Sequence, residues 1–270
     1  QKQSQYDDAI KCYDEVINKK PSLLCCVADK AQCLSSSGKH KEAIKLYEAI
    51  REALTQSETM PQDSEDMMLT EEDMYWQMIA VPPEREECEL EEENLLNYIS
   101  WEWIKLGEYE KGLTIVEEAL EINSKKAGII DTKAVALKKL GKFEEAKEWY
   151  EKVFEITKKD EDEMEIAICH RKAGNSLDEE NKEKYNIESI KMIDKILEKN
   201  NSNSYALYHK ALSYWNLKQY EEAKKCIKSA IKINPNKMEY WYELGEIAFF
   251  AENNLVLANF YYDKCIEINP

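Results

Sequence analysis

Three histidines and eight cysteines are the side chains that could support catalysis or metal binding in this chain of 270 residues. His40 falls in a polar turn between two expected helices and is expected to be exposed, whereas His170 and His209 fall on expected helices. The sequence contains no G-x-S-x-G, H-E-x-x-H, phosphate-loop or dinucleotide-binding motif. Because catalysis needs titratable groups that converge in a sheltered pocket, we predict no catalytic residue and no enzymatic activity.

The cysteines form no C-x-x-C pair. Cys25, Cys26 and Cys33 lie close together in the sequence, but a metal site would need further ligands at suitable spacing. We therefore predict no metal and no cofactor. Several cysteines fall inside apolar helical patterns, which indicates reduced thiols in the cytoplasm or another reducing intracellular compartment.

The net charge of -17 is concentrated in one segment. Residues 55–93 hold 14 acidic residues and one basic residue, and the rest of the chain is close to neutral. Nucleic-acid binding depends on phosphate neutralisation by Lys and Arg, so we expect no nucleic-acid partner. No apolar stretch approaches the ~20 residues that span a bilayer, and we expect no membrane partner.

The side chains discussed above must be positioned by helices, because seven Gly and six Pro are too few for a turn-rich β fold. Segments such as DTKAVALKKLGKFEEAKEWYEKVFEI from Asp131 and YHKALSYWNLKQYEEAKKCIKSAIKINP from Tyr208 each predict helix, short turn, helix. A small residue recurs in every second helix, at steps of 34, 69, 34, 43, 34 and 35 residues, and is the site where paired helices can approach closely: Ala9, Ala43, Gly112, Ala146, Ser189, Ala223 and Ala258.

This pattern resembles the tetratricopeptide repeat, a helix-turn-helix unit of 34 residues. The resemblance implies an all-α fold, an α-solenoid that winds as a right-handed superhelix, with about six full repeats and a leading half repeat. Where the family usually has Leu before the small residue of the first helix, this chain has Lys30, Lys133, Lys172 and Lys210. We expect each Lys to lay its methylene stem over the packed face and its ammonium group in water.

The predicted boundaries follow from the repeats. Residues 1–21 are the second helix of a truncated repeat, and full repeats span 24–54, 93–126, 127–160, 163–203 (with a lengthened turn), 204–237 and 238–270. The chain has neither an initiator Met nor a polar capping helix, so we expect it to be a piece of a longer array.

Residues 55–92 interrupt the repeats as an acidic insert. We expect a polar loop over 55–69, then a short amphipathic helix over 70–81 that ends at Pro82-Pro83. Three roles stay open for the insert: a solvated loop that covers its own scaffold, a partner-binding motif, or a lid in which residues 70–81 dock on the chain itself.

Members of the family bind extended peptides or helices on the concave face that the first helices form. The resemblance therefore implies a non-enzymatic interaction scaffold with a protein or peptide partner, although this chain lacks the Lys and Asn pairs of members that clamp chaperone tails. Alternatives are a structural spacer that docks through its ends or convex face, and a regulatory arm of a larger protein. Helical phase and residue type select the candidate partner-binding residues: Asn97, Trp101, Asp131, Lys138, His170, Arg171, Tyr205, Tyr208, His209, Trp215 and Tyr242.

Overall fold

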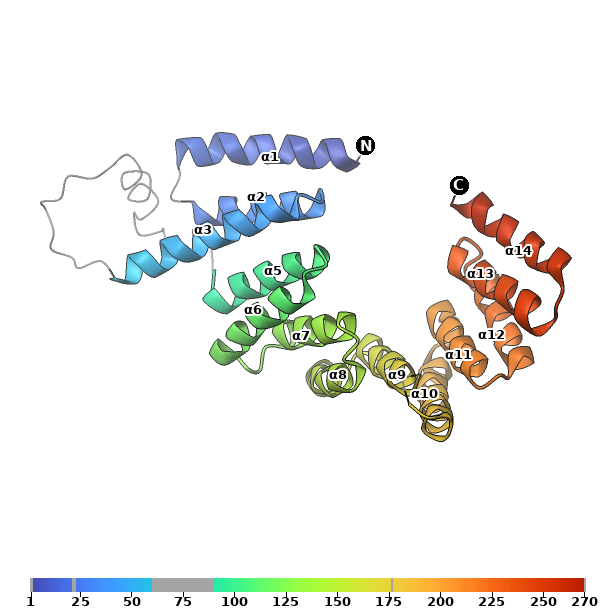
Figure 1. Cartoon of the computed structure of the whole chain (residues 1–270). Coiled ribbons are helices and arrows are strands. Elements are labelled where there is room, and N and C mark those ends of the chain that lie inside the picture. The colour runs from blue at the N-terminus through green and yellow to red at the C-terminus, as the bar shows by residue number, and fades with distance from the viewer. Residues whose placement is uncertain (1, 21–22, 60–89, 176, 270) are drawn as a thin grey trace, which may run out of the picture. The chain divides into compact units, whose positions relative to one another are not determined.

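The computed structural model describes residues 2–20, 23–59, 90–175 and 177–269 (Figure 1). The helix that we predict over 70–81, its docking on the chain and most of the acidic insert lie outside the described residues. The described part divides into two compact units, Gln1–Leu140 and Gly141–Pro270.

Both units consist of helices, with no strand among the residues that the structure describes. Each helix packs against the next helix along its unit, which confirms the predicted all-α fold of consecutive helix pairs. The first unit holds α1 (Lys2–Lys19), α2 (Leu24–Ser36), α3 (His40–Thr59), α5 (Glu92–Lys105), α6 (Tyr109–Ile122) and α7 (Ala127–Lys139). The second holds α8 (Phe143–Thr157), α9 (Asp160–Gly174), α10 (Glu179–Lys199), α11 (Ser204–Asn216), α12 (Tyr220–Ile233), α13 (Met238–Glu246), the π-helical turn η1 (Ile247–Ala251) and α14 (Leu255–Ile268).

Small residues lie at the helix crossings, as the repeat pattern predicts. Ala31 and Ala43 are buried between α2 and α3, and Ala211 and Ala223 are buried between α11 and α12. At Gly112 of α6, an added Cβ atom would lie 2.7 Å from Ile104 of α5. A larger side chain at these sites would push the paired helices apart.

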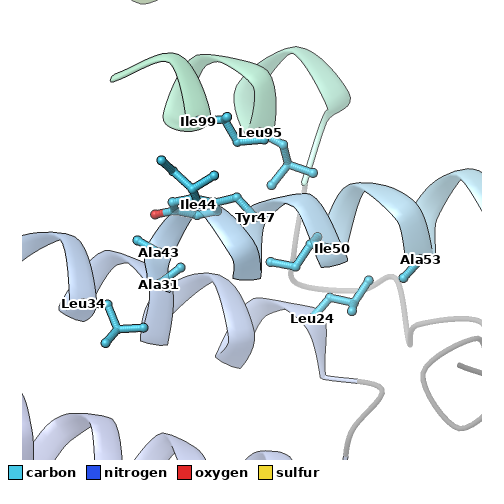
Figure 2. Packing of buried hydrophobic residues seen from close by; sticks show 10 residues of the cluster. All are labelled: Leu24, Ala31, Leu34, Ala43, Ile44, Tyr47, Ile50, Ala53, Leu95 and Ile99. Carbon is cyan, nitrogen blue, oxygen red and sulfur yellow. The ribbon is translucent and has the colours of Figure 1, made fainter. Parts of the chain in front are cut away.

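Larger apolar side chains fill the space on either side of each crossing. Figure 2 shows the cluster of the first unit, in which Ile50 and Ala53 of α3 lie over Leu24 of α2, and Leu95 and Ile99 of α5 approach Tyr47 of α3. Three consecutive helices therefore share one apolar core, and a helix pair buries its faces only when the next pair is present.

The turn between paired helices contains a residue in the left-handed backbone region. Gly38 and Gly107 adopt φ values of 83° and 84° in two such turns. The equivalent residue between α11 and α12 is Lys218, with φ of 60°. A side chain is strained in this region, so the turn geometry is imposed by the packing of the two helices.

Three of the four lysines that replace Leu before the small residue make ion pairs, so their ammonium groups are paired with carboxylates rather than surrounded by water alone. Lys30 of α2 binds Asp14 of α1 at 2.5 Å, and Lys210 of α11 binds Asp194 of α10 at 2.5 Å. Lys133 of α7 likewise binds Glu117 of α6 at 2.7 Å. In each case the acidic partner lies on the preceding helix, five residues after its small residue.

Helix α3 extends past the predicted repeat boundary at residue 54, whereas the long helix α10 stays within its predicted repeat, 163–203. The helix α3 continues to Thr59, five residues into the segment that we predict to be a loop. No Gly or Pro occurs between residues 55 and 60, so nothing in that stretch forces the helix to end. The helix α10 has 21 residues and is the longest second helix of the second unit.

Candidate partner-binding site

Arg171 is a buried cation on α9, with 6% of its surface exposed. Its Nε atom is buried and has no hydrogen-bond partner. Among the described residues, no carboxylate lies within 4 Å of its guanidinium group. Burial lowers the pKa of Arg171, although a guanidinium group stays protonated at neutral pH.

Two tyrosines of α11 lie near this cation. Tyr205 packs edge-on against His209 with 4.5 Å between ring centroids, and Tyr208 packs against the same ring at 5.0 Å. Burial raises the pKa of Tyr205 and of Tyr208 to about 12, and both phenols interact electrostatically with Arg171. His209 is buried between them, whereas 47% of Tyr205 is exposed.

Glu243 of α13 completes the group. Burial and, second, the charge of Glu246 raise its pKa to about 7, although Arg171 and a hydrogen bond with the Tyr208 hydroxyl oppose the rise. We define the Arg171 cluster as Arg171, Tyr205, Tyr208, His209 and Glu243. It joins residues of α9, α11 and α13, the first helices of three consecutive pairs.

Tyr242 extends the aromatic surface beside the cluster, with 48% of its surface exposed. Its ring lies 6.0 Å from that of Tyr262 of α14, whose hydroxyl donates a hydrogen bond to Glu246 at 2.7 Å. Gly245 makes this arrangement possible, because an added Cβ atom there would lie 2.3 Å from the Tyr262 ring.

Two predicted site residues of the second unit lie apart from the Arg171 cluster. The His170 ring stacks on the Tyr185 ring of α10, with 4.3 Å between the ring centroids. Burial lowers the pKa of His170, and the charge of the nearby Lys147 lowers it as well. Trp215 packs edge-on against Tyr220 of α12 at 5.0 Å. Both rings face second helices of the pairs.

The predicted site residues of the first unit form no comparable cluster. The Oδ1 atom of Asn97 is buried without a hydrogen-bond partner. Trp101 is exposed and lies beneath the Lys105 ammonium group at 5.9 Å. Asp131 and Lys138 of α7 are partly buried. Partner binding by any of these residues stays a prediction.

The expectation that His40 is exposed is wrong. Its Nδ1 atom lies 2.7 Å from Oε2 of Glu102, and its side chain is mostly buried. Ser35 donates to Oε1 of the same carboxylate at 2.6 Å, and Lys105 donates to Ser35 at 2.8 Å. The Ser35 hydroxyl therefore donates to Glu102 and accepts from Lys105, so its hydrogen bonds are used within the network. We therefore interpret this network as structural.

Glu243, Glu246 and Tyr262 were not among the predicted site residues. Glu243 follows Tyr242 directly, and this adjacency in a first helix is the signal that could have identified it. Its altered pKa arises from neighbours on three helices, which no local pattern encodes.

Among the described residues, His, Cys, Asp and Glu side chains nowhere gather in a set of three that could hold a metal ion. None of the described cysteines forms a disulfide bond. Within the same part of the chain, no helix combines the length and the apolarity that crossing a bilayer requires.

Two segments match a known repeat family. Residues 128–160 and residues 204–237 each match a model of the tetratricopeptide repeat. The comparison with curated proteins gives no match.

Several solved structures share the fold. A tetratricopeptide repeat protein of Parabacteroides merdae has a TM-score of 0.72 at 14% identity, over 99% of this chain and 88% of that one. A thermophilic repeat protein of Thermus thermophilus has a TM-score of 0.57 at 20% identity, over 66% and 92%. YrrB, described as a repeat protein with an unusual peptide-binding site, has a TM-score of 0.54 at 15% identity, over 86% and 96%.

Helix pairs that follow one another and meet at buried small residues define an all-α helical-repeat protein of the α-solenoid class. The two matched segments identify which repeat it is. Residues 128–160 and 204–237 of this chain are tetratricopeptide repeats.

Proposed function

We propose that this protein is a non-enzymatic interaction scaffold that binds a peptide or helical segment of a partner protein. The binding surface is the first-helix face of the second unit, where Tyr205, Tyr208 and Tyr242 lie beside the buried Arg171. The observation that carries the proposal is the exposure of Tyr205 and Tyr242 next to a buried arginine whose Nε atom has no hydrogen-bond partner. Tyr and Arg are the residues that most often dominate binding energy at protein interfaces.

The chemistry of the described residues supports a binding role over catalysis. The one network that joins Ser, His, Lys and Glu side chains uses its donors and acceptors within itself. The net charge of -17 favours a protein partner over a nucleic acid. The fold is shared with YrrB, a protein described by its peptide-binding site.

The test uses random peptides displayed on phage and selected on the intact chain. Selected peptides are then measured on the Tyr208→Ala/Tyr242→Ala variant by fluorescence anisotropy. We expect at least a hundredfold loss of affinity, because two aromatic anchors of an interface are removed. The control is Ile266→Ala, which removes an exposed apolar side chain from α14 and should leave affinity unchanged. Peptides that bind both variants as well as the unaltered chain would overturn the proposal.

A second candidate function is assembly through the last helix pair. Val256 and Phe260 of α14 are 83% and 51% exposed. The equivalent residues of α12, Glu221 and Lys225, are charged. An apolar stripe at positions that are polar in the preceding pair favours an isologous contact with a second copy of this chain.

Sedimentation equilibrium tests the second candidate. If α14 pairs with a second copy, the apparent mass should rise with concentration for the unaltered chain. It should stay at the monomer mass for Val256→Glu/Phe260→Lys, which restores charge at both positions. A monomer mass for the unaltered chain at all concentrations would exclude the second candidate.

A further inference from the structure

Glu246 of α13 is a half-buried carboxylate whose Oε1 atom accepts a hydrogen bond from the Tyr262 hydroxyl of α14 at 2.7 Å. Among the described residues, no Lys or Arg nitrogen lies within 4 Å of its carboxylate oxygens. Other partly buried carboxylates of the second unit, Glu163 and Glu252, bind lysines. Taking a carboxylate out of water without a nearby cation is unfavourable, so the charge of Glu246 adds nothing to the stability of the fold.

The packing of the helix pair does not require a charge at Glu246. The residue that follows the small residue of the first helix is neutral in the other five repeats, namely Gln32, Trp101, Val135, Gly174 and Leu212. The Tyr262 hydroxyl needs only one acceptor, and the neutral amide oxygen of a Gln would provide it. A structural role as an acceptor therefore does not explain why this residue is a carboxylate.

Two tyrosine rings lie beside this carboxylate. Tyr242 precedes Glu246 by four residues, which places both on one side of α13. The charge of Glu246 raises the pKa of Tyr242, and burial and a hydrogen bond with the same carboxylate add to the rise. The ring centroids of Tyr242 and Tyr262 are 6.0 Å apart, with 43° between the ring planes. We define the Glu246 site as Tyr242, Glu246 and Tyr262.

Rings and carboxylates of this kind attract cations. Elsewhere in the chain, Lys152 lies over the Trp149 ring at 3.6 Å and Lys264 over the Phe260 ring at 5.7 Å. The face of an aromatic ring attracts a cation through its negative potential, and a carboxylate beside the ring attracts the same cation. The Glu246 site combines both features, and the Tyr242 ring is 48% exposed, so a cation of another molecule can reach it.

The charges around the Glu246 site also favour a cation. Glu239 of α13 is exposed on the same helix. Burial and the charge of Glu246 raise the pKa of Glu243, whereas Arg171 lowers it. Arg171 therefore compensates Glu243, while the charges of Glu239 and Glu246 give this end of the proposed binding surface a negative potential.

We propose that the Glu246 site binds a Lys or Arg side chain of the docked segment. The Tyr242 and Tyr262 rings pack against its methylene stem and its cationic group, and the Glu246 carboxylate pairs with its charge. This inference rests on the proposed function and names the chemistry of the partner: a basic residue next to the apolar residues that contact Tyr205 and Tyr208.

The test begins with phage-selected peptides that lose affinity on the Tyr208→Ala/Tyr242→Ala variant. Each Lys or Arg of such a peptide is replaced in turn by Gln, and affinities for the unaltered chain are measured by fluorescence anisotropy. In 0.15 M NaCl, charges more than about 8 Å apart are largely screened, so only a nearby carboxylate contributes much. We expect at least a tenfold loss at one position. Peptides that contain no basic residue, or that lose less than tenfold at every position, would overturn the inference.

A double-mutant cycle assigns the effect to Glu246. On Glu246→Gln, which keeps an acceptor for the Tyr262 hydroxyl, the basic peptide and its Gln version should bind within twofold of each other. The control is Glu239→Gln, which removes an exposed carboxylate from the same helix and should keep the tenfold preference. A preference that survives Glu246→Gln would contradict the assignment. Its loss in Glu239→Gln as well would also contradict it, because the preference would then reflect the overall charge of the surface.

Two substitutions of Tyr242 test the contribution of its ring. Tyr242→Phe keeps the ring, and Tyr242→Leu replaces it with an aliphatic side chain. The preference for the basic peptide over its Gln version should persist in the Phe variant and fall at least threefold in the Leu variant. Equal preferences in the two variants would refute the role of the ring.

NMR spectroscopy of the unaltered chain provides a test that needs no variant to fold. The peptide carries a ¹³C-labelled Lys or Arg at the position where Gln reduces affinity. Protons held over the face of an aromatic ring are shifted upfield, so the protons next to the charged group should move upfield on binding. Unchanged positions of these signals would overturn the contact with the tyrosine rings.

The two proposals fail in different ways. If no selected peptide depends on Tyr208 and Tyr242, the proposed function is wrong and this inference with it. If peptides depend on these rings but not on any basic residue, the proposed function stands and the inference alone is wrong.

Discussion

Glu102 accepts hydrogen bonds from side chains of three helices. Ser35 of α2 and Lys105 of its own helix donate to Oε1, and His40 of α3 lies against Oε2. A buried carboxylate is tolerated only when its oxygens are satisfied in this way. Arg171 differs from Glu102, because its Nε atom is buried without a hydrogen-bond partner. Glu102 is therefore interpreted as structural, and Arg171 as part of the proposed binding surface.

Glu102→Ala should destabilise the first unit by about 3 kcal/mol, because it leaves the Ser35 hydroxyl and the Lys105 ammonium group without their buried acceptor. Urea denaturation followed by circular dichroism measures the change. The control is Glu108→Ala, which removes an exposed pair with Lys111 and should change stability by less than about 0.5 kcal/mol. Equal stabilities of the two variants would show that the network contributes nothing.

Glu243 should make the second unit less stable as the pH rises. Its pKa is about 7 in the folded chain and about 4.5 in the unfolded chain, so the folded state binds the extra proton between these values. Its contribution is therefore complete below pH 4.5 and is lost as the pH rises through 7.

Glu243→Gln removes this titration. Relative to the unaltered chain, the variant should gain about 2 kcal/mol between pH 5 and pH 8, measured by thermal or urea unfolding at each pH. The control is Glu239→Gln, an exposed carboxyl on the same helix. A constant difference between the Glu243 variant and the unaltered chain at every pH would contradict the raised pKa.

At the scale of the helices, a repeated ion pair joins three of the first helices, α2, α7 and α11, to the helix before each of them. Lys30, Lys133 and Lys210 occupy equivalent positions and bind acidic residues at equivalent positions. Burial alone would lower the pKa of Lys210, but the bond to Asp194 outweighs it and raises the pKa. The pairs thus replace, with polar contacts, the packing that Leu gives other members of the family.

A double-mutant cycle with Lys210→Met and Asp194→Asn should give a coupling of about 0.5–1 kcal/mol, measured by urea unfolding, and 1 M NaCl should reduce it. The control cycle uses Lys191 and Glu188, an exposed pair within α10, and should give a smaller coupling. If Lys210→Met alone stabilises the chain, apolar packing at this position outweighs the ion pair.

The helix pairs were predictable because close packing leaves few options. Only small side chains fit where helices cross, so Ala43, Gly112 and Ala223 mark the repeats by their spacing alone. The ion pairs were not predictable in the same way. In the sequence alone, Asp14 and Asp194 look like any other acidic residue of an exposed helix face. Only the folded structure shows that each lies beside a lysine.

The candidate site was predicted in part, for a similar reason. Helical phase indicated the exposed rings of Tyr205 and Tyr242, because first helices repeat one geometry. It gave no sign that Arg171 is buried, since arginine is usually exposed. His40 was misplaced because a turn residue is ordinarily exposed, and its partner Glu102 lies 62 residues away.

At the scale of the whole molecule, the division into two compact units indicates where cooperativity should weaken. In repeat proteins each repeat contacts only its neighbours, so stability is a sum of local terms. The Gln1–Leu140 and Gly141–Pro270 units each have their own core. Damage to one core should therefore act mainly within its own unit.

Two matched substitutions test this expectation. Gly112→Ala places a Cβ atom 2.7 Å from Ile104 in the first unit, and Gly245→Ala places one 2.3 Å from the Tyr262 ring in the second. Each should destabilise its unit by about 1–3 kcal/mol through overpacking. Hydrogen exchange measured by mass spectrometry should show faster exchange over 92–139 for Gly112→Ala and over 204–268 for Gly245→Ala, with the other unit unchanged. Accelerated exchange throughout both units in either variant would mean that the chain unfolds as one cooperative body, because a strained crossing in one unit would then lower the stability of both.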